Sequence, residues 1–137
     1  VIGDSVNIAF RLEALAPKYN TDIVISAQTL RQAKAEGVFE YRLLDWVRVK
    51  GRKNPIELYE IIDHQDVNIK KLKLANAKLI ELGLNYRKVQ KWELAITHFK
   101  QALEINPNDT LAIHHLEQCA KLQNTQLAED WDGSILL

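Results

Sequence analysis

The sequence has no methionine, a single cysteine and no excess of either charge, because 18 lysines and arginines balance 18 aspartates and glutamates. Without a net field the chain as a whole is not drawn to nucleic acid or to an anionic membrane, so no nucleic-acid partner is expected. The lone Cys119 cannot form an internal disulfide and lies in a helical pattern, which favours a packed thiol in a reducing compartment. Any site for an anion must therefore be local.

Long apolar runs are missing as well. No stretch of about 18 apolar residues could span a membrane, and no basic region followed by an apolar one marks a signal peptide at the start. A cytoplasmic location is expected for this stretch, while membrane anchoring of a longer parent protein stays open. The chain opens at Val1 on an apolar pair that runs straight into a turn, which indicates a fragment whose upstream part holds some of the chemistry.

The residues that are present form a typical globular composition, 47% hydrophobic and 26% charged, with room for one or two small domains. Near the start, three apolar residues recur at helical spacing: Ile8, Leu12 and Leu15. They predict a helix over residues 5–18, with Asp4 or Ser5 as its N-cap.

Strand patterns follow this helix. A β-branched run predicts a buried strand at 22–26, and a short helix is expected at 27–35. Residues 40–49 and 55–62 are rich in strand formers and flank a polar turn at 51–54, which is typical of a β-hairpin. These strands are too few for a sheet buried on both faces, so further strands are expected upstream.

The second half of the chain is helical in pattern. Residues 64–73 are polar and indicate a linker or the lead-in to a helix, and helical spacing then continues to residue 123 with a break at 106–109. The predicted organisation has four parts: a domain at 1–63, a linker at 64–73, helices at 74–123 and a tail at 124–137.

Three blocks of sequence carry a resemblance to a known family. Residues 3–13 read GDSVNIAFRLE, residues 23–26 read IVIS, and residues 44–51 read LDWVRVKG, leading to PIELYE at 55–60. In this order and spacing the blocks resemble the class III adenylate and guanylate cyclases. The resemblance covers residues 1–62 and implies a phosphorus-oxygen lyase that makes a 3',5'-cyclic nucleotide for intracellular signalling.

Asn7 and Arg11 lie four positions apart, so on a helix they share one face and can hold one ligand together. That face lies about a quarter turn from the apolar stripe, at the margin of the buried surface, as the wall of a cleft requires. An arginine can donate two charge-assisted hydrogen bonds to phosphate oxygens and keeps its proton. Taken alone, the pair is more often part of an ordinary surface helix.

The resemblance gives these residues roles. It implies that Arg11 stabilises the charge of the transition state, that Asn7 orients the ribose, and that Lys50 reaches the triphosphate. For Lys50 a solvated hairpin tip is an equally good reading. The substrate is a nucleoside triphosphate, with ATP favoured but the choice against GTP undecided by the residues present.

The resemblance also implies parts that the chain lacks. Mg²⁺ or Mn²⁺ is expected as cofactor, with its aspartate ligands upstream, and the site is expected to form with a second cyclase domain in a homodimer. The fragment alone is therefore expected to be inactive. His114 and His115 are neighbours in a predicted helix whose side chains diverge by about 100°, so packing or surface roles are expected of them rather than a shared metal.

Residues 76–109 match the 34-residue tetratricopeptide pattern. Residues at its consensus offsets are Leu82, Gly83, Tyr86, Ala95, Phe99, Ala102 and Pro107. From Thr110 the phase restarts with Ile113, Leu116 and Ala120, which gives about one and a half repeats, too few for an independent solenoid. The unit is therefore expected to lean on the cyclase domain, on its dimer mate or on upstream repeats, and the apolar tail at 131–137 to dock onto the helices.

The expected fold class is α+β: the C-terminal portion of a ferredoxin-like class III cyclase domain, in the order helix, strand, helix, β-hairpin, followed by an all-α tetratricopeptide hairpin. The helical part serves either as a groove for a protein partner or as a cap that stabilises the C-terminus. The alternative function is a tetratricopeptide interaction protein whose cyclase-like domain is a catalytically dead regulatory module. Intact Asn7 and Arg11 favour the enzyme.

Overall fold

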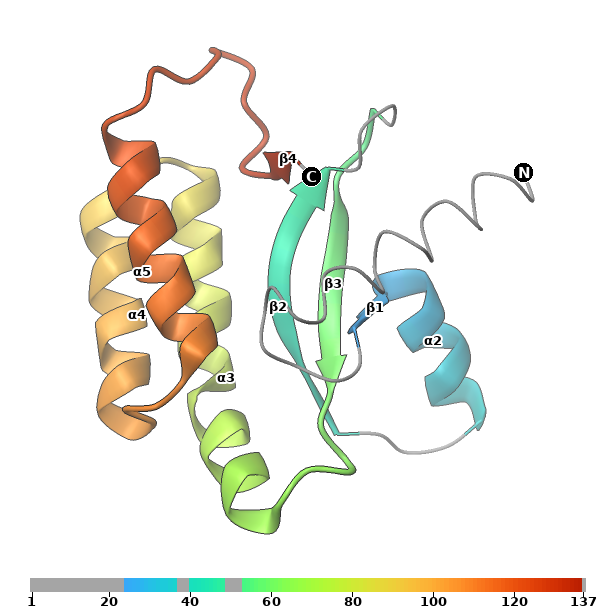
Figure 1. The fold of residues 1–137 in the computed structure, drawn as a ribbon. Coiled ribbons are helices and arrows are strands. Elements are labelled where there is room, and N and C mark those ends of the chain that lie inside the picture. The colour runs from blue at the N-terminus through green and yellow to red at the C-terminus, as the bar shows by residue number, and fades with distance from the viewer. Residues whose placement is uncertain (1–23, 37–39, 49–52, 137) are drawn as a thin grey trace.

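The structure is a computed structural model that describes residues 24–36, 40–48 and 53–136. The predicted helix at 5–18 lies outside these residues. The described elements are, in order, β1 (Val24–Ser26), α2 (Ala27–Glu36), β2 (Tyr41–Arg48), β3 (Ile56–Ile61), α3 (Val67–Lys88), α4 (Trp92–Ile105), α5 (Thr110–Gln123) and β4 (Ile135–Leu136). Helices α3, α4 and α5 gather on one side of the sheet and α2 lies on the other (Figure 1). The chain is thus a mixture of helices and a small, mainly antiparallel sheet.

The sheet has the strand order β1-β3-β2-β4. Strand β3 pairs antiparallel with both β1 and β2, which confirms the predicted hairpin. A bulge interrupts the pairing of β2 with β3 between Leu43 and Asp45. Because a bulge adds one residue to a strand, the alternation of burial slips there, and the consecutive residues Leu44 and Asp45 are both fully buried.

Helix α3 begins at Val67, inside the polar segment 64–73. Of the two possibilities for this segment, the lead-in to a helix describes residues 67–73. The reason is local: the side chain of Asp66 accepts a hydrogen bond from the amide of Asn68 and so caps the first turn. The polar side chains that follow lie mostly on the exposed face of that helix.

Helices α3 and α4 form the predicted helical hairpin, and its contact depends on small residues. A Cβ atom added to Gly83 would lie 2.5 Å from the ring of Phe99, so the two helices can approach this closely because residue 83 is a glycine. Ala95 and Ala102 are buried beside it. Helix α4 then ends at Ile105, before Pro107, as the pattern predicted.

Helix α5 does not bury all of the residues at which the repeat phase restarts. Its buried residues are Leu111, Ala112, His115 and Cys119. Of the residues at which the repeat phase restarts, Leu116 is partly buried against the core, whereas Ile113 and Ala120 are exposed. The physical reason is that α5 packs against α4 and also reaches β2, where the His115 ring bonds to the carbonyl of Leu44, so the sheet selects its buried face.

The tail packs against the helices and the sheet. Trp131 packs against Trp92 with ring centroids 6.0 Å apart, which confirms that the tail docks on the helical hairpin. It then continues to the sheet, where β4 pairs in parallel with the end of β2 at Val47 and Arg48. Figure 1 shows this red segment returning from the end of α5 to the strands.

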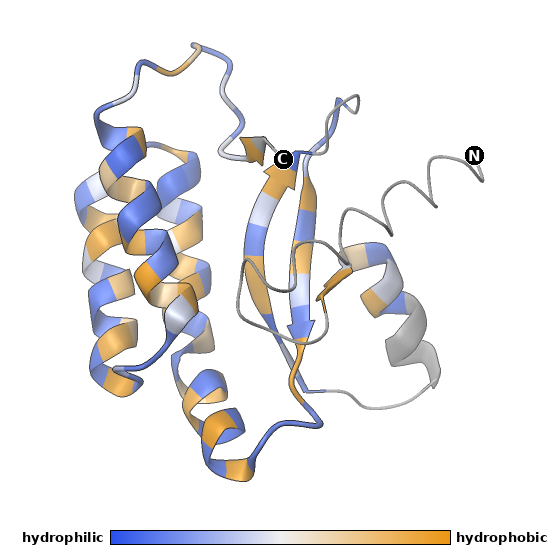
Figure 2. Ribbon diagram, in the orientation of Figure 1, coloured by the Kyte–Doolittle hydropathy of each residue, from blue (hydrophilic) through white to orange (hydrophobic). Residues whose placement is uncertain are grey.

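Within the described part of the chain, one hydrophobic core joins the strands and the helices. Buried apolar residues of β2 and β3 form one cluster with those of α3, α4 and α5, and Figure 2 shows hydrophobic positions on both the strands and the helices. The helical unit therefore leans on the sheet of its own chain, which is one of the three supports that its small number of repeats predicted. Among the described residues, no helix is both long and apolar enough to cross a membrane.

Candidate functional site

The predicted site residues Asn7, Arg11 and Lys50 lie outside the described residues, so their roles stay predictions. The structure does place the two strands on either side of the predicted Lys50 turn, since β2 ends at Arg48 and β3 begins at Ile56. What it adds is a set of buried polar contacts between this hairpin and the helices. Sequence reasoning missed these contacts.

The first buried network is centred on Arg42 of β2. Its guanidinium donates two hydrogen bonds to the carboxylate of Asp109, from Nη1 to Oδ2 at 2.7 Å and from Nη2 to Oδ1 at 2.9 Å. Nη1 also donates to Asn76 Oδ1 at 3.0 Å, and Asn76 Nδ2 donates to Asp109 Oδ2 at 2.7 Å. Arg42 and Asp109 are each 3% exposed and Asn76 is 0% exposed, so this fork-to-fork pair joins the sheet to α3 and to the start of α5 in a nearly dry environment.

A second ion pair, between Glu60 and Lys73, lies beside the first. Glu60 of β3 lies 3.7 Å from Arg42 Nε and accepts a hydrogen bond from Lys73 Nζ at 2.6 Å. Two cations therefore face two anions, and the network carries no net charge. A buried cluster of this kind needs that balance, because each unpaired ion would cost several kcal/mol of desolvation.

Burial by itself raises the pKa of Asp109, but the hydrogen bonds and the charge of Arg42, together with Asn76 and the amide of Leu111, outweigh it and hold the pKa below its ordinary value of 3.8. The unfolded chain then binds a proton more readily than the folded chain. The stabilisation is therefore present above the unfolded pKa and is lost as the pH falls through the folded pKa.

The lowered pKa of Asp109 predicts how the stability of the protein changes with pH. The free energy of unfolding of the wild type should exceed that of Asp109→Asn near neutral pH, and the difference should shrink as the pH falls below about 4. Urea unfolding of both proteins across this range measures it. Comparing the two proteins removes the contribution of all other carboxylates. A difference that stays constant down to about pH 2 would contradict the assignment to Asp109.

The second buried network lies two to three residues further along β2, at Leu44 and Asp45. Arg87 Nη2 lies 2.7 Å from Asp45 Oδ1, and both side chains are 0% exposed. Nearby, the Nε2 atom of His115 lies 2.7 Å from the carbonyl oxygen of Leu44, which accepts the hydrogen bond, and the ring stacks on Phe99. Burial lowers the pKa of His115 to about 4, so the ring is neutral at physiological pH.

Cys119, one turn further along α5, is fully buried. Burial raises the pKa of its thiol to about 11. A thiolate is the reactive form, so this cysteine is an inert part of the core, as the sequence predicted.

His114 and His115 lie closer together than expected. Their ring centroids are 5.4 Å apart, and one ligand atom from each, with one from Asp45, lie within 4.8 Å of one another. The expected divergence of neighbouring helical side chains is thus wrong here, because the two rings turn toward each other edge to face.

This group does not fit the Mg²⁺ or Mn²⁺ of a cyclase. Mg²⁺ prefers carboxylates, phosphates and water in an octahedron, whereas two of these three side chains are imidazoles. The third, Asp45, already pairs with the Arg87 cation, which would repel a metal ion. No step of the chemistry is therefore assigned to a metal at this place.

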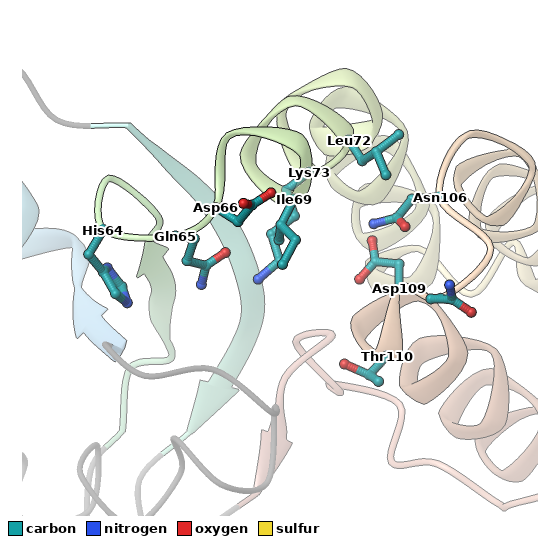
Figure 3. Close-up of a pocket in the computed structure, with 10 residues that line it drawn as sticks. His64, Gln65, Asp66, Ile69, Leu72, Lys73, Asn106, Asp109 and Thr110 are labelled. Carbon is teal, nitrogen blue, oxygen red and sulfur yellow. The ribbon is translucent and has the colours of Figure 1, made fainter.

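A cleft of about 600 Å³ opens between the β3–α3 connection and the α4–α5 turn (Figure 3). It is lined by His64, Gln65, Asp66, Ile69, Leu72, Lys73, Asn106, Asn108, Asp109 and Thr110. Its two carboxylates cap α3 and α5, and its lysine pairs with Glu60, so these charged groups already have structural tasks. The cleft offers a binding surface and no arrangement for nucleophilic catalysis.

Comparisons with known proteins find a repeat family and a set of adenylate cyclases. The family described as "Tetratricopeptide repeat" matches residues 79–109. The chain is 32% identical over 130 residues, 93% of its length, to "Adenylate cyclase, terminal-differentiation specific" of Dictyostelium discoideum. It is 40% identical over 62 residues, 44% of its length, to "Adenylate cyclase" of Anabaena cylindrica, and 33% identical over 61 residues, also 44%, to "Adenylate cyclase 1" of Rhizobium meliloti (strain 1021).

The chain spans a small share of these relatives: 6% of the Dictyostelium protein, 12% of the Anabaena protein and 9% of the Rhizobium protein. No solved structure matches it significantly. The match to adenylate cyclases covers much of the chain and agrees with the blocks at 3–13 and 44–51, and the repeat agrees with the packing of Gly83 on Phe99. The chain is a relative of adenylate cyclases that carries a tetratricopeptide repeat.

Proposed function

We propose that this chain is a C-terminal fragment of a class III cyclase, which converts a nucleoside triphosphate, with ATP favoured, into a 3',5'-cyclic nucleotide and pyrophosphate. Residues 1–63 are the end of its catalytic domain, and the tetratricopeptide helices that follow are a module for protein contact. One observation carries the proposal: the motif at residues 3–13 stands in a chain that is similar to an adenylate cyclase over 93% of its length. The ferredoxin-like arrangement of the complete domain is part of the same proposal.

In this reaction the ribose 3'-hydroxyl attacks the α-phosphorus and pyrophosphate leaves. The guanidinium of Arg11 binds the phosphoryl oxygens on which negative charge builds up, and so stabilises the transition state. Asn7, one helical turn earlier, binds a ribose oxygen and orients the attacking hydroxyl. Lys50, between β2 and β3, contacts the triphosphate.

The other half of the site belongs to a second cyclase domain. Mg²⁺ or Mn²⁺, held by aspartates upstream of Val1, would neutralise the triphosphate and lower the pKa of the attacking hydroxyl. In a homodimer each protomer would supply Asn7 and Arg11 to the nucleotide held by its partner.

The alternative is a tetratricopeptide interaction protein with a catalytically dead cyclase-like domain. The observation in its favour is the repeat at 79–109, a type of unit that commonly serves protein contact. The presence of both Asn7 and Arg11 argues against it, because a dead domain has no need of the pair.

Activity of the complete protein tests the proposal. With ATP or GTP and either Mg²⁺ or Mn²⁺, the complete protein should form a cyclic nucleotide, measured by chromatography of the products, and this chain alone should form none. Folding of the chain is checked by circular dichroism in the same buffer. A complete protein that folds and binds ATP but forms no cyclic nucleotide with either metal would favour the dead module.

A further inference from the structure

The helices and the tail contact β2 at nearly every residue from 42 to 48. Asp109 holds Arg42, His115 bonds to the carbonyl of Leu44, and Arg87 holds Asp45. The backbone of Val47 and Arg48 then pairs with β4. The side of the helices that faces the sheet is therefore already occupied by a strand of the same chain.

Arg87 is the residue at which three segments meet. From the last turn of α3, its Nη2 atom contacts Asp45 Oδ1 at 2.7 Å, the carbonyl of Trp46 at 3.1 Å and the carbonyl of Gly133 at 3.0 Å. It is 0% exposed. One buried nitrogen thus ties the repeat to β2 and to the tail at once.

The tail closes over the same point. Gly133 has a φ of +88°, and a Cβ added to it would lie 2.7 Å from the Cα of Lys88, so a larger residue would be strained and would clash with backbone. Lys88 lies with its ammonium 3.8 Å from the ring centroid of Trp46, and the Trp46 indole donates to the carbonyl of Asp132 at 3.1 Å. The tail therefore reaches β2 by a path that fits a glycine at position 133.

We infer that Arg87 is a positioning residue, which fixes the end of β2 to the tetratricopeptide repeat and so sets the place from which the chain continues toward Lys50. The inference rests on the proposed function for the role of Lys50 alone. The repeat then acts within its own chain, by holding the hairpin of β2 and β3. A force or partner that shifts the last turn of α3 would be felt at Asp45 and Trp46 of β2 through the Arg87 side chain.

Hydrogen exchange on the chain tests the physical link. In Arg87→Met the backbone amides of residues 134–136 and of the end of β2 should exchange at least about tenfold faster than in the wild type, because the tail is released. Arg87→Lys should restore much of the protection, since one ammonium nitrogen with three N–H groups can serve the three acceptors of Nη2. Lys71→Met, which removes an exposed cation from the same helix, is the matched control and should change nothing.

Arg87→Met leaves the buried Asp45 without its partner and could unfold the chain. The double variant Asp45→Leu with Arg87→Met replaces the ion pair by apolar side chains, a change that buried pairs often tolerate. It should stay folded and still lose protection in the tail. Gly133→Ala releases the tail without changing any charge and should give the same result. Unchanged exchange in the folded double variant would overturn the inference, whatever the result for Gly133→Ala.

Kinetics of the complete cyclase test the consequence. If the link sets the Lys50 turn, the double variant should raise the KM for the nucleoside triphosphate about fivefold or more while kcat changes less than about twofold, because a contact made equally in the ground and transition states affects KM. A purely structural role would instead lower the amount of active enzyme and leave KM alone. An inactive wild type would refute the proposed function, whereas an active wild type with unchanged KM in the folded double variant would refute this inference.

Discussion

Arg11→Ala in the complete cyclase should lower kcat by about 100-fold or more, the effect of removing one donor that binds charge built up in the transition state. In the proposed mechanism Arg11 contacts the phosphoryl oxygens whose charge grows as pyrophosphate leaves. The KM for the nucleoside triphosphate should change much less than kcat, because the contact strengthens in the transition state. Steady-state assays of cyclic nucleotide formation measure both constants.

Arg31→Ala is the matched control. Arg31 is an exposed arginine of α2, and the same change there should leave kcat within about twofold of the wild type. Arg11→Lys adds a graded test, because a lysine offers a point charge without the planar fork and should recover part of the lost rate. If Arg11→Ala turns over at the wild-type rate, the role given to Arg11 is wrong.

Asp109→Ala should lower the free energy of unfolding by about 3 to 5 kcal/mol, because it leaves the buried guanidinium of Arg42 without its main partner. Asp109 is 3% exposed and binds Arg42 through both carboxylate oxygens. Its removal also deprives α5 of its N-cap, since the same carboxylate accepts from the amide of Leu111. Urea denaturation followed by circular dichroism measures the change.

Asp66→Ala separates the contribution of helix capping from that of the ion pair with Arg42. Asp66 caps α3 in the same way, by accepting from the amide two residues on, but it is exposed and has no arginine partner among the described residues. Its loss should cost about 1 kcal/mol, the usual value of an N-cap. Equal losses for Asp66→Ala and Asp109→Ala would mean that the ion pair with Arg42 contributes no net stability.

Local patterns were enough to predict most of the elements. The β-branched run before Ser26 forms β1, the hairpin forms on either side of the polar turn, and the repeat register placed Gly83 against Phe99. These features depend on residues a few positions apart or on a fixed repeat spacing, so they can be predicted from the linear order of the side chains. The resemblance in residues 3–13 pointed to the cyclases for the same reason.

The polar contacts between sheet and helices could not be predicted in this way. Arg42 and Asp109 are 67 positions apart, and Trp46 and Arg87 are 41 apart, so no periodicity connects them. In the sequence each of these charged residues reads as one more solvated side chain, because charged residues are usually exposed. Their burial becomes favourable only when a partner of opposite charge is delivered from another element.

The sequence by itself determined most of the described helices and strands, the repeat and the resemblance to the cyclases, because each depends on short-range spacing and on the chemistry of neighbouring side chains. The tertiary structure decided which face of α5 is buried, where the tail goes, and which charges leave water. These outcomes depend on the sum of many contacts between distant segments: the bulge at Leu44 that buries Asp45, the arginine that meets it from α3, and the glycine that lets the tail pass Lys88. Such contacts form only once distant segments have come together in the folded chain. A local sequence pattern therefore cannot predict which of them will form.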